Sequence, residues 1–138
     1  MRLEHLNLVV EDIEKSLEFY RAAFPHWRVR SEGKSDWYGK PRRWLHFGDD
    51  YNYLAFADNG VGNNRNLKGH DSGLAHFCFE TNDIASLIMR LEKAGFVISN
   101  TGAVNQFRKN VYFIDPDGFE VEFVEYLSDI PNERNKND

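Results

Sequence analysis

Two histidines and two glutamates are the side chains of this sequence whose types and spacing favour metal chemistry. His5 and His76 each begin an alternating polar and apolar stretch, and each is followed seven residues later by Asp-Ile. Near the C-terminus, Glu120 and Glu122 alternate with apolar residues. Two neutral imidazoles and one carboxylate on rigid strands are a ligand set for Fe, Mn, Zn, Ni or Co. Such a set leaves coordination positions open for a substrate oxygen.

The elements that would position these side chains occur twice along the chain. Residues 5–10 alternate like a strand, and residues 11–24 then place apolar side chains at helical spacing. Residues 76–96 repeat the same order of strand and amphipathic helix. A repeat of this length indicates two duplicated modules, because a solenoid would need shorter and more numerous units.

Further strands are expected after each helix, so that each half follows the plan βαβββ. They are predicted near residues 27–32, 42–48, 51–57, 107–114 and 119–126. The fold class is therefore α+β, with two βαβββ modules whose curved mixed sheet surrounds a concave site.

The predicted modules form a single domain over residues 1–127. Module one covers about residues 1–59, a linker rich in glycine and asparagine covers about 60–73, and module two covers about 74–127. Residues 128–138 are expected to be a polar tail, frayed over its final PNERNKND stretch.

One face of each predicted sheet must pack on its helix, which leaves the other face free to hold a ligand. Phe77 belongs to the helix-packed face, and alternation then places His76 on the opposite face. The same alternation places His5, Glu120 and Glu122 there. Strand period alone does not decide whether they meet. There are three alternative interpretations. The histidines are solvated or packed, the histidine repeat was inherited without a function, or Glu122 is ordinary surface charge.

The composition argues against several classes of partner. The formal net charge is −5 and no basic stripe is present, which disfavours binding to nucleic acid. No apolar run approaches the length of a membrane-spanning helix, and no signal-peptide pattern follows Met1. The single cysteine, Cys78, excludes an intrachain disulfide and fits a reducing compartment. We therefore expect a cytoplasmic protein that binds neither nucleic acid nor membrane.

The chain resembles the vicinal oxygen chelate superfamily over residues 1 to about 127. This superfamily includes glyoxalase I, extradiol dioxygenases, fosfomycin-resistance enzymes and bleomycin-binding proteins. The resemblance is carried by three segments, HLNLVV, HFCFETNDI and YFIDPDGFEVEFVE. It implies paired βαβββ modules around a divalent metal ion, with His5, His76 and Glu122 as ligands and Glu120 exposed.

One position departs from the pattern of glyoxalase I and methylmalonyl-CoA epimerase. Both enzymes have a fourth metal ligand, a Glu or Gln on the fourth strand of the first module. In the similar segment of this chain, YLAF, that position is Ala55. A methyl group cannot bind a metal, so a glyoxalase I mechanism is not expected. A two-residue hairpin turn between the third and fourth strands would place Trp44 opposite Ala55, and His46 opposite Tyr53. His46 is then a substitute ligand or general base, or a packed or partly solvated histidine.

Three ligands of the type His/His/Glu resemble those of extradiol dioxygenases and fosfomycin-resistance transferases. By resemblance to the extradiol signature, Tyr112 would donate a hydrogen bond to a substrate oxygen. The upstream histidine of that signature is missing from the stretch TGAVNQFRKN. The phosphonate-binding pattern of the transferases is not evident either, since Arg108 and Lys109, the nearest cations, are expected to lie on the surface.

The leading hypothesis is a divalent-metal enzyme of the dioxygenase, lyase or transferase type. Its substrate would be a small molecule that chelates the metal through two adjacent oxygens. The alternative is a metal-free protein that binds or sequesters a small molecule, as bleomycin-binding members of the fold do. Resemblance to single-chain members of the superfamily implies a homodimer.

Overall fold

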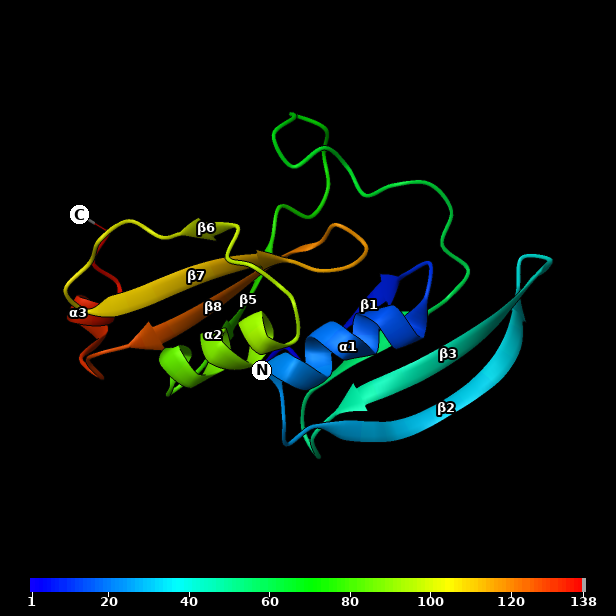
Figure 1. The fold of residues 1–138 in the computed structure, drawn as a ribbon, viewed down its shortest axis with the longest axis horizontal. Coiled ribbons are helices and arrows are strands. Elements are labelled where there is room, and N and C mark those ends of the chain that lie inside the picture. The colour runs from blue at the N-terminus through cyan, green and yellow to red at the C-terminus, as the bar shows by residue number, and fades with distance from the viewer. Residues whose placement is uncertain (138) are drawn as a thin grey trace. The chain divides into compact units, whose positions relative to one another are not determined.

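Each half of the chain folds into a helix packed against a four-stranded sheet. The computed structural model describes residues 1–137 (Figure 1). The two halves separate as units between Asn63 and Asn64, a division that lies inside the glycine- and asparagine-rich stretch 60–73.

The first unit has a sheet of strand order β1-β4-β3-β2. Its elements are β1 (His5–Val9), α1 (Ile13–Ala23), β2 (Arg28–Trp37), β3 (Lys40–Gly48) and β4 (Tyr53–Ala57). β1 and β4 are parallel, because α1 provides the crossover between the two edges, and the other pairings are antiparallel. The extended β2–β3 hairpin is longer than the strands predicted near residues 27–32 and 42–48.

Helix α1 begins where the sequence places a capping acid. The Asp12 side chain accepts hydrogen bonds from the backbone N–H groups of Glu14 and Lys15, at 2.9 and 3.3 Å. On the buried face of the helix, Tyr20 contacts Phe56 of β4 with 5.3 Å between ring centroids. This contact shows which face of β4 is turned to the helix, and Ala55 therefore belongs to the other face.

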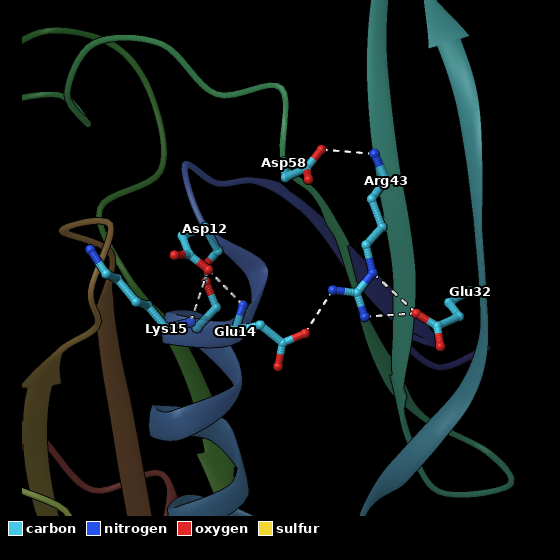
Figure 2. A network of polar contacts seen from close by, with 7 residues as sticks. Asp12, Glu14, Lys15, Glu32, Arg43 and Asp58 are labelled. Atoms are coloured by element: carbon cyan, nitrogen blue, oxygen red, sulfur yellow. Dashed lines mark hydrogen bonds and ion pairs between the residues drawn. The ribbon is translucent and has the colours of Figure 1, made fainter.

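The exposed end of α1 is tied to the sheet by one arginine, shown in Figure 2. Arg43 of β3 makes ion pairs with Glu14 of α1 at 2.6 Å and with Glu32 of β2 at 2.7 Å. Its backbone N–H also donates to Asp58 at 2.8 Å. These groups form a network on the surface of the first unit, away from the predicted site residues.

The second unit repeats the plan with strand order β5-β8-β7-β6. Its elements are β5 (Phe77–Glu80), α2 (Ile84–Lys93), β6 (Asn100–Thr101), β7 (Arg108–Ile114) and β8 (Glu120–Tyr126), followed by α3 (Pro131–Arg134). β5 and β8 are parallel and β7 and β8 antiparallel, as β1/β4 and β3/β4 are in the first unit. The α+β class and the βαβββ plan of each half are thus confirmed.

The turn between β7 and β8 is held by a buried carboxylate. Asp115 is 4% exposed, and its Oδ1 accepts hydrogen bonds from the backbone N–H groups of Asp117 and Phe119, at 3.0 and 2.9 Å. Gly118 has φ +85°, a conformation that glycine adopts without strain. The turn sets the register in which Glu122 lies opposite Tyr112.

The turn between β3 and β4 differs from the predicted one. It is a four-residue turn in which Asp49 accepts backbone hydrogen bonds from Tyr51 and Asn52, so that Gly48 pairs with Tyr53. As a result His46 lies opposite Ala55. The predicted pairings of Trp44 with Ala55 and of His46 with Tyr53 were wrong, because they assumed a two-residue turn.

The C-terminal segment is more ordered than its composition suggests. Residues 131–134 form α3, and the residues after it contact the second unit. The prediction of a frayed tail was therefore wrong for the described part, while Asp138 lies outside the described residues. Within residues 1–137, no helix is long and apolar enough to cross a membrane.

We predict that Asp115→Ala lowers the free energy of unfolding by about 1–3 kcal/mol, because two buried backbone N–H groups lose their acceptor. Asp115→Asn keeps the Oδ1 acceptor and should cost less. Urea denaturation followed by circular dichroism measures both. Equal losses in the two variants would contradict the role assigned to Oδ1.

Candidate metal centre

The second unit brings together two of the three predicted metal ligands. His76 lies directly before β5, and Glu122 lies in the middle of β8. The Nε2 atom of His76 is 3.1 Å from Oε2 of Glu122. The His76 side chain is 41% exposed, whereas Glu122 as a residue is only 8% exposed. A half-open imidazole beside a buried carboxylate leaves one side of this pair accessible.

The second oxygen of Glu122 has its own partner. Asn110, two residues before Tyr112 on β7, donates a hydrogen bond from Nδ2 to Oε1 of Glu122. The amide holds the carboxylate in place and leaves Oε2 directed at His76. Hydrogen bonds of this kind orient the carboxylate ligands of metal sites.

The spacing of the two donors fits a divalent ion. Two ligands bound at right angles, each about 2.1 Å from the ion, lie about 3.0 Å apart. The separation of 3.1 Å between His76 Nε2 and Glu122 Oε2 matches this value. An imidazole and a carboxylate are also donors that Mn, Fe, Zn, Ni and Co accept. His76 and Glu122 therefore fit a metal as two adjacent ligands.

Glu120 lies on the same face of β8 as Glu122, two residues closer to the turn between β7 and β8. Its Oε1 is 3.7 Å from Nδ1 of His76, and its side chain is 24% exposed. Glu120 is thus half-buried beside the far nitrogen of the imidazole. There it can favour the tautomer that leaves Nε2 free to bind a metal.

Tyr112 and Cys78 are the other ionisable groups around Glu122. Burial, together with a hydrogen bond to Glu122, raises the pKa of the Tyr112 hydroxyl to about 12. Although Cys78 as a residue is exposed, partial desolvation of its thiol and the charge of Glu122 raise its pKa to about 12. Both groups are therefore protonated at neutral pH, and Tyr112 is a hydrogen-bond donor. Its ring meets the His76 ring edge-on at 5.6 Å.

His5, the third predicted ligand, lies in the first unit at the start of β1. Its ring stacks on Tyr53 with 4.5 Å between centroids, and its Nδ1 is 3.3 Å from Oε2 of Glu4. The side chain is 39% exposed, so the imidazole is available to a ligand. Among residues 1–137, no group of three or more His, Cys, Asp or Glu side chains is placed to hold a metal ion.

His46 lies in the same part of the first unit, opposite Ala55. Its Nδ1 is 3.3 Å from Oγ of Ser31, and its ring is 4.7 Å from that of Tyr53. Arg30 places its guanidinium 4.5 Å above the Tyr53 ring. Burial lowers the pKa of His46, and the charges of Arg30 and His5 lower it further against the weaker opposing effect of Glu4. His46 is therefore neutral at pH 7.

The registers of the two units relate their side chains pair by pair. Ala55 lies opposite His46 and beside Asn7, and Glu122 lies opposite Tyr112 and beside Cys78. Ala55 is thus the first-unit counterpart of Glu122, as the family resemblance implied. His46 is the counterpart of Tyr112, a relation that becomes visible only with the correct turn.

A cavity of about 510 Å³ extends from Glu122 along the second unit. Strands β7 and β8 line it together with the loop before β7 and the C-terminal segment. The lining residues include Cys78, Asn105, Arg108, Asn110, Tyr112, Glu122, Val124, Tyr126, Arg134 and Asn137. Sequence reasoning missed Asn110 and the C-terminal residues. Alternation from Tyr112 could have found Asn110, but no sequence pattern predicts that the tail returns to the sheet.

The family model of the "Glyoxalase/Bleomycin resistance protein/Dioxygenase superfamily" matches residues 2–123. The chain belongs to this superfamily. The resemblance predicted from the three sequence segments is thereby confirmed, and the matched range contains His5, His76 and Glu122. The comparison with curated proteins gives no match.

Solved structures of superfamily proteins share the fold. A glyoxalase/bleomycin resistance protein/dioxygenase domain from Frankia sp. EAN1pec is 20% identical with a TM-score of 0.75, over 99% of this chain and 98% of that one. The fosfomycin resistance protein FosX from Mesorhizobium loti is 18% identical with a TM-score of 0.66, over 96% and 95%. A mutant of FosX from Listeria monocytogenes, complexed with Mn(II) and 1S,2S-dihydroxypropylphosphonic acid, is 16% identical with a TM-score of 0.69, over 98% of each chain.

We predict that His46 of this superfamily member titrates below the ordinary value of 6.5, as measured by NMR on the imidazole nitrogens. Because its pKa is lowered in the folded state, its contribution to stability is complete above pH 6.5. That contribution falls as the pH drops from there through the folded pKa. Arg30→Gln should raise the pKa of His46.

Arg28→Gln is the matched control for this titration, because Arg28 carries the same charge on β2 but is paired with Asp50 at 2.5 Å. It should leave His46 unchanged. A His46 pKa at or above 6.5, or equal responses to the two arginine substitutions, would contradict the electrostatic assignment.

Proposed function

We propose that the protein is a divalent-metal-dependent enzyme that acts on a small molecule with two adjacent oxygen atoms. The observation that carries this proposal is the contact of His76 Nε2 with the buried carboxylate of Glu122. Burying a carboxylate is costly unless it is paired or binds a metal. The fixed orientation given by Asn110 suits a ligand better than a solvated surface charge.

His5, His76 and Glu122 are the proposed metal ligands. A bound divalent ion would supply Lewis-acid chemistry, polarising a coordinated oxygen and holding the substrate in place. Fe, Mn, Zn, Ni and Co all suit two imidazoles and a carboxylate. The Listeria FosX complex supports the substrate class, because dihydroxypropylphosphonic acid carries two hydroxyl groups on adjacent carbons beside Mn(II).

The remaining site residues take roles that their chemistry allows. Tyr112 would donate a hydrogen bond to a substrate oxygen, since it is a protonated hydroxyl beside Glu122. His46 is neutral and would accept a proton from the substrate or serve as a further ligand. Ala55 offers no donor at the counterpart of Glu122, which argues against glyoxalase I chemistry. The reaction would instead be of the dioxygenase, lyase or transferase type.

We further infer that the enzyme acts as a homodimer in the cytoplasm, without a nucleic-acid or membrane partner. The net charge of −5 and the single cysteine support the absence of nucleic acid and the reducing compartment. The dimer is proposed from the resemblance to single-chain members of the superfamily.

The metal can be tested on the full chain with Mn²⁺ by isothermal titration calorimetry and by elemental mass spectrometry. We predict about one ion per chain and a rise in melting temperature on binding. Glu122→Gln and His76→Ala should each weaken binding by at least about 100-fold, more than the loss of an outer-shell partner. His5→Ala should weaken it likewise.

Glu120→Gln is the matched control for this experiment. It removes a carboxylate from the same face of β8 but should weaken Mn²⁺ binding by only about tenfold, the lower end of the range for an outer-shell partner. If no metal binds, and if stability is unchanged in His5→Ala and Glu122→Ala, the enzyme proposal fails. The metal-free binding protein then becomes the better account.

A further inference from the structure

The cavity of the second unit has two chemically different ends. Its strands contribute three facing pairs along the same face of β7 and β8, in the order Tyr112 with Glu122, Asn110 with Val124, and Arg108 with Tyr126. The first pair adjoins His76, and the last pair is the furthest from it along the strands. A strand rises about 3.3 Å per residue, so the four residues from Tyr112 to Arg108 span about 13 Å.

Arg108 is held at the far end by the C-terminal segment. Its Nη1 donates to the backbone carbonyls of Arg134 and Lys136, at 3.1 and 2.9 Å, and its Nη2 donates to Oδ1 of Asn137 at 3.0 Å. A guanidinium has five N–H groups, and these bonds use three of them. Two N–H groups of a half-buried and oriented arginine therefore remain for a ligand.

The charge of Arg108 is not neutralised within the described part of the chain. Its three acceptors are neutral oxygens, and no carboxylate of residues 1–137 forms an ion pair with it. The neighbouring Arg134 differs, because it pairs with Glu80 at 3.0 Å and stacks on Tyr126. A cation that lines a cavity without an acidic partner attracts an anion.

The wall that holds Arg108 is formed by α3 and the residues after it. The family match ends at residue 123, whereas α3 and the residues after it lie beyond this limit. Asn105, in the loop before β7, donates from Nδ2 to the carbonyl of Lys136 at 3.1 Å and closes the wall from the other side. The amide side chains of Asn105 and Asn137 add polar groups around the guanidinium.

We propose that Arg108 and the C-terminal segment form a subsite for an oxyanion at the distal end of an elongated substrate. The oxyanion is a carboxylate or a phosphate-type group, which a guanidinium recognises through paired N–H donors. Between the ends, Val124 lines the cavity opposite Asn110 and suits a less polar segment. The link to chelating oxygens at the opposite end rests on the proposed function, whereas the oxyanion subsite itself does not.

The length of the cavity separates this substrate from small chelating molecules. A three-carbon phosphonate such as dihydroxypropylphosphonic acid is shorter than the backbone span of about 13 Å between the Tyr112–Glu122 pair and the Arg108–Tyr126 pair. The substrate should instead carry its two adjacent oxygens and its oxyanion at opposite ends of a chain or ring system.

The subsite can be tested in two steps on the full chain. In the first step, inorganic phosphate and acetate are titrated separately into metal-free protein, and NMR follows the side-chain Nε–H of Arg108. We expect a saturable shift, larger with phosphate for a phosphate-type end and larger with acetate for a carboxylate end. In the second step, calorimetry compares decanedioate with succinate on Mn²⁺-loaded protein. The long dicarboxylate should bind about tenfold more tightly.

Three variants separate recognition from structure. Arg108→Gln should remove the preference for decanedioate. Lys109→Gln should keep it, because Lys109 carries the same charge but is exposed and lies on the opposite face of β7. Arg134→Gln loosens the C-terminal segment but leaves the Arg108 guanidinium in place. The concentration of phosphate or acetate that half-saturates the Arg108 shift should therefore change by less than about threefold.

The proposal is overturned if neither anion shifts Arg108, if succinate binds as tightly as decanedioate, or if Arg108→Gln and Lys109→Gln have equal effects. The two proposals also fail separately. Protein that binds no Mn²⁺ but shows the shift at Arg108 keeps the oxyanion subsite and loses the metal enzyme. Protein that binds Mn²⁺ without the shift loses only the subsite.

Discussion

The placement of the Glu122 carboxylate is the constraint on which the second unit's site depends. A carboxyl group at 8% exposure needs partners for both oxygens, and the structure supplies Asn110 for one and His76 for the other. The Asp115 turn sets the strand register that brings Glu122 opposite Tyr112. Burial and the same carboxylate together raise the pKa of Tyr112, so one buried carboxylate organises the donors around it.

The two units share the same arrangement of helix and strands but carry different side chains at equivalent positions. The first-unit position equivalent to Glu122 is Ala55, and the position equivalent to Tyr112 is His46. The first unit therefore offers imidazoles around Tyr53, with no carboxylate facing them from β4. The second unit offers an imidazole, two carboxylates and a hydroxyl.

Much of the fold was predictable because its signals are local. Strand alternation and helical spacing placed α1, α2, β7 and β8 close to their observed bounds, and the Asp-Ile repeat located both helix starts. The contact of His76 with Glu122 followed from face assignment together with the family resemblance. The register of β3 and β4 was missed, because it depends on whether Asp49 caps a four-residue turn or the chain reverses sooner. Composition does not distinguish those turns.

The sequence by itself determined the family, the α+β plan of each half and the candidate metal ligands. These properties depend on side-chain type and on periods of two or 3.6 residues, which are visible along the chain. The tertiary structure decided which partners each group has. It turned Asn110 toward Glu122, placed His46 opposite Ala55, and brought a polar tail back to Arg108. Those contacts join residues far apart in sequence, and their energies depend on burial and orientation that no local pattern encodes.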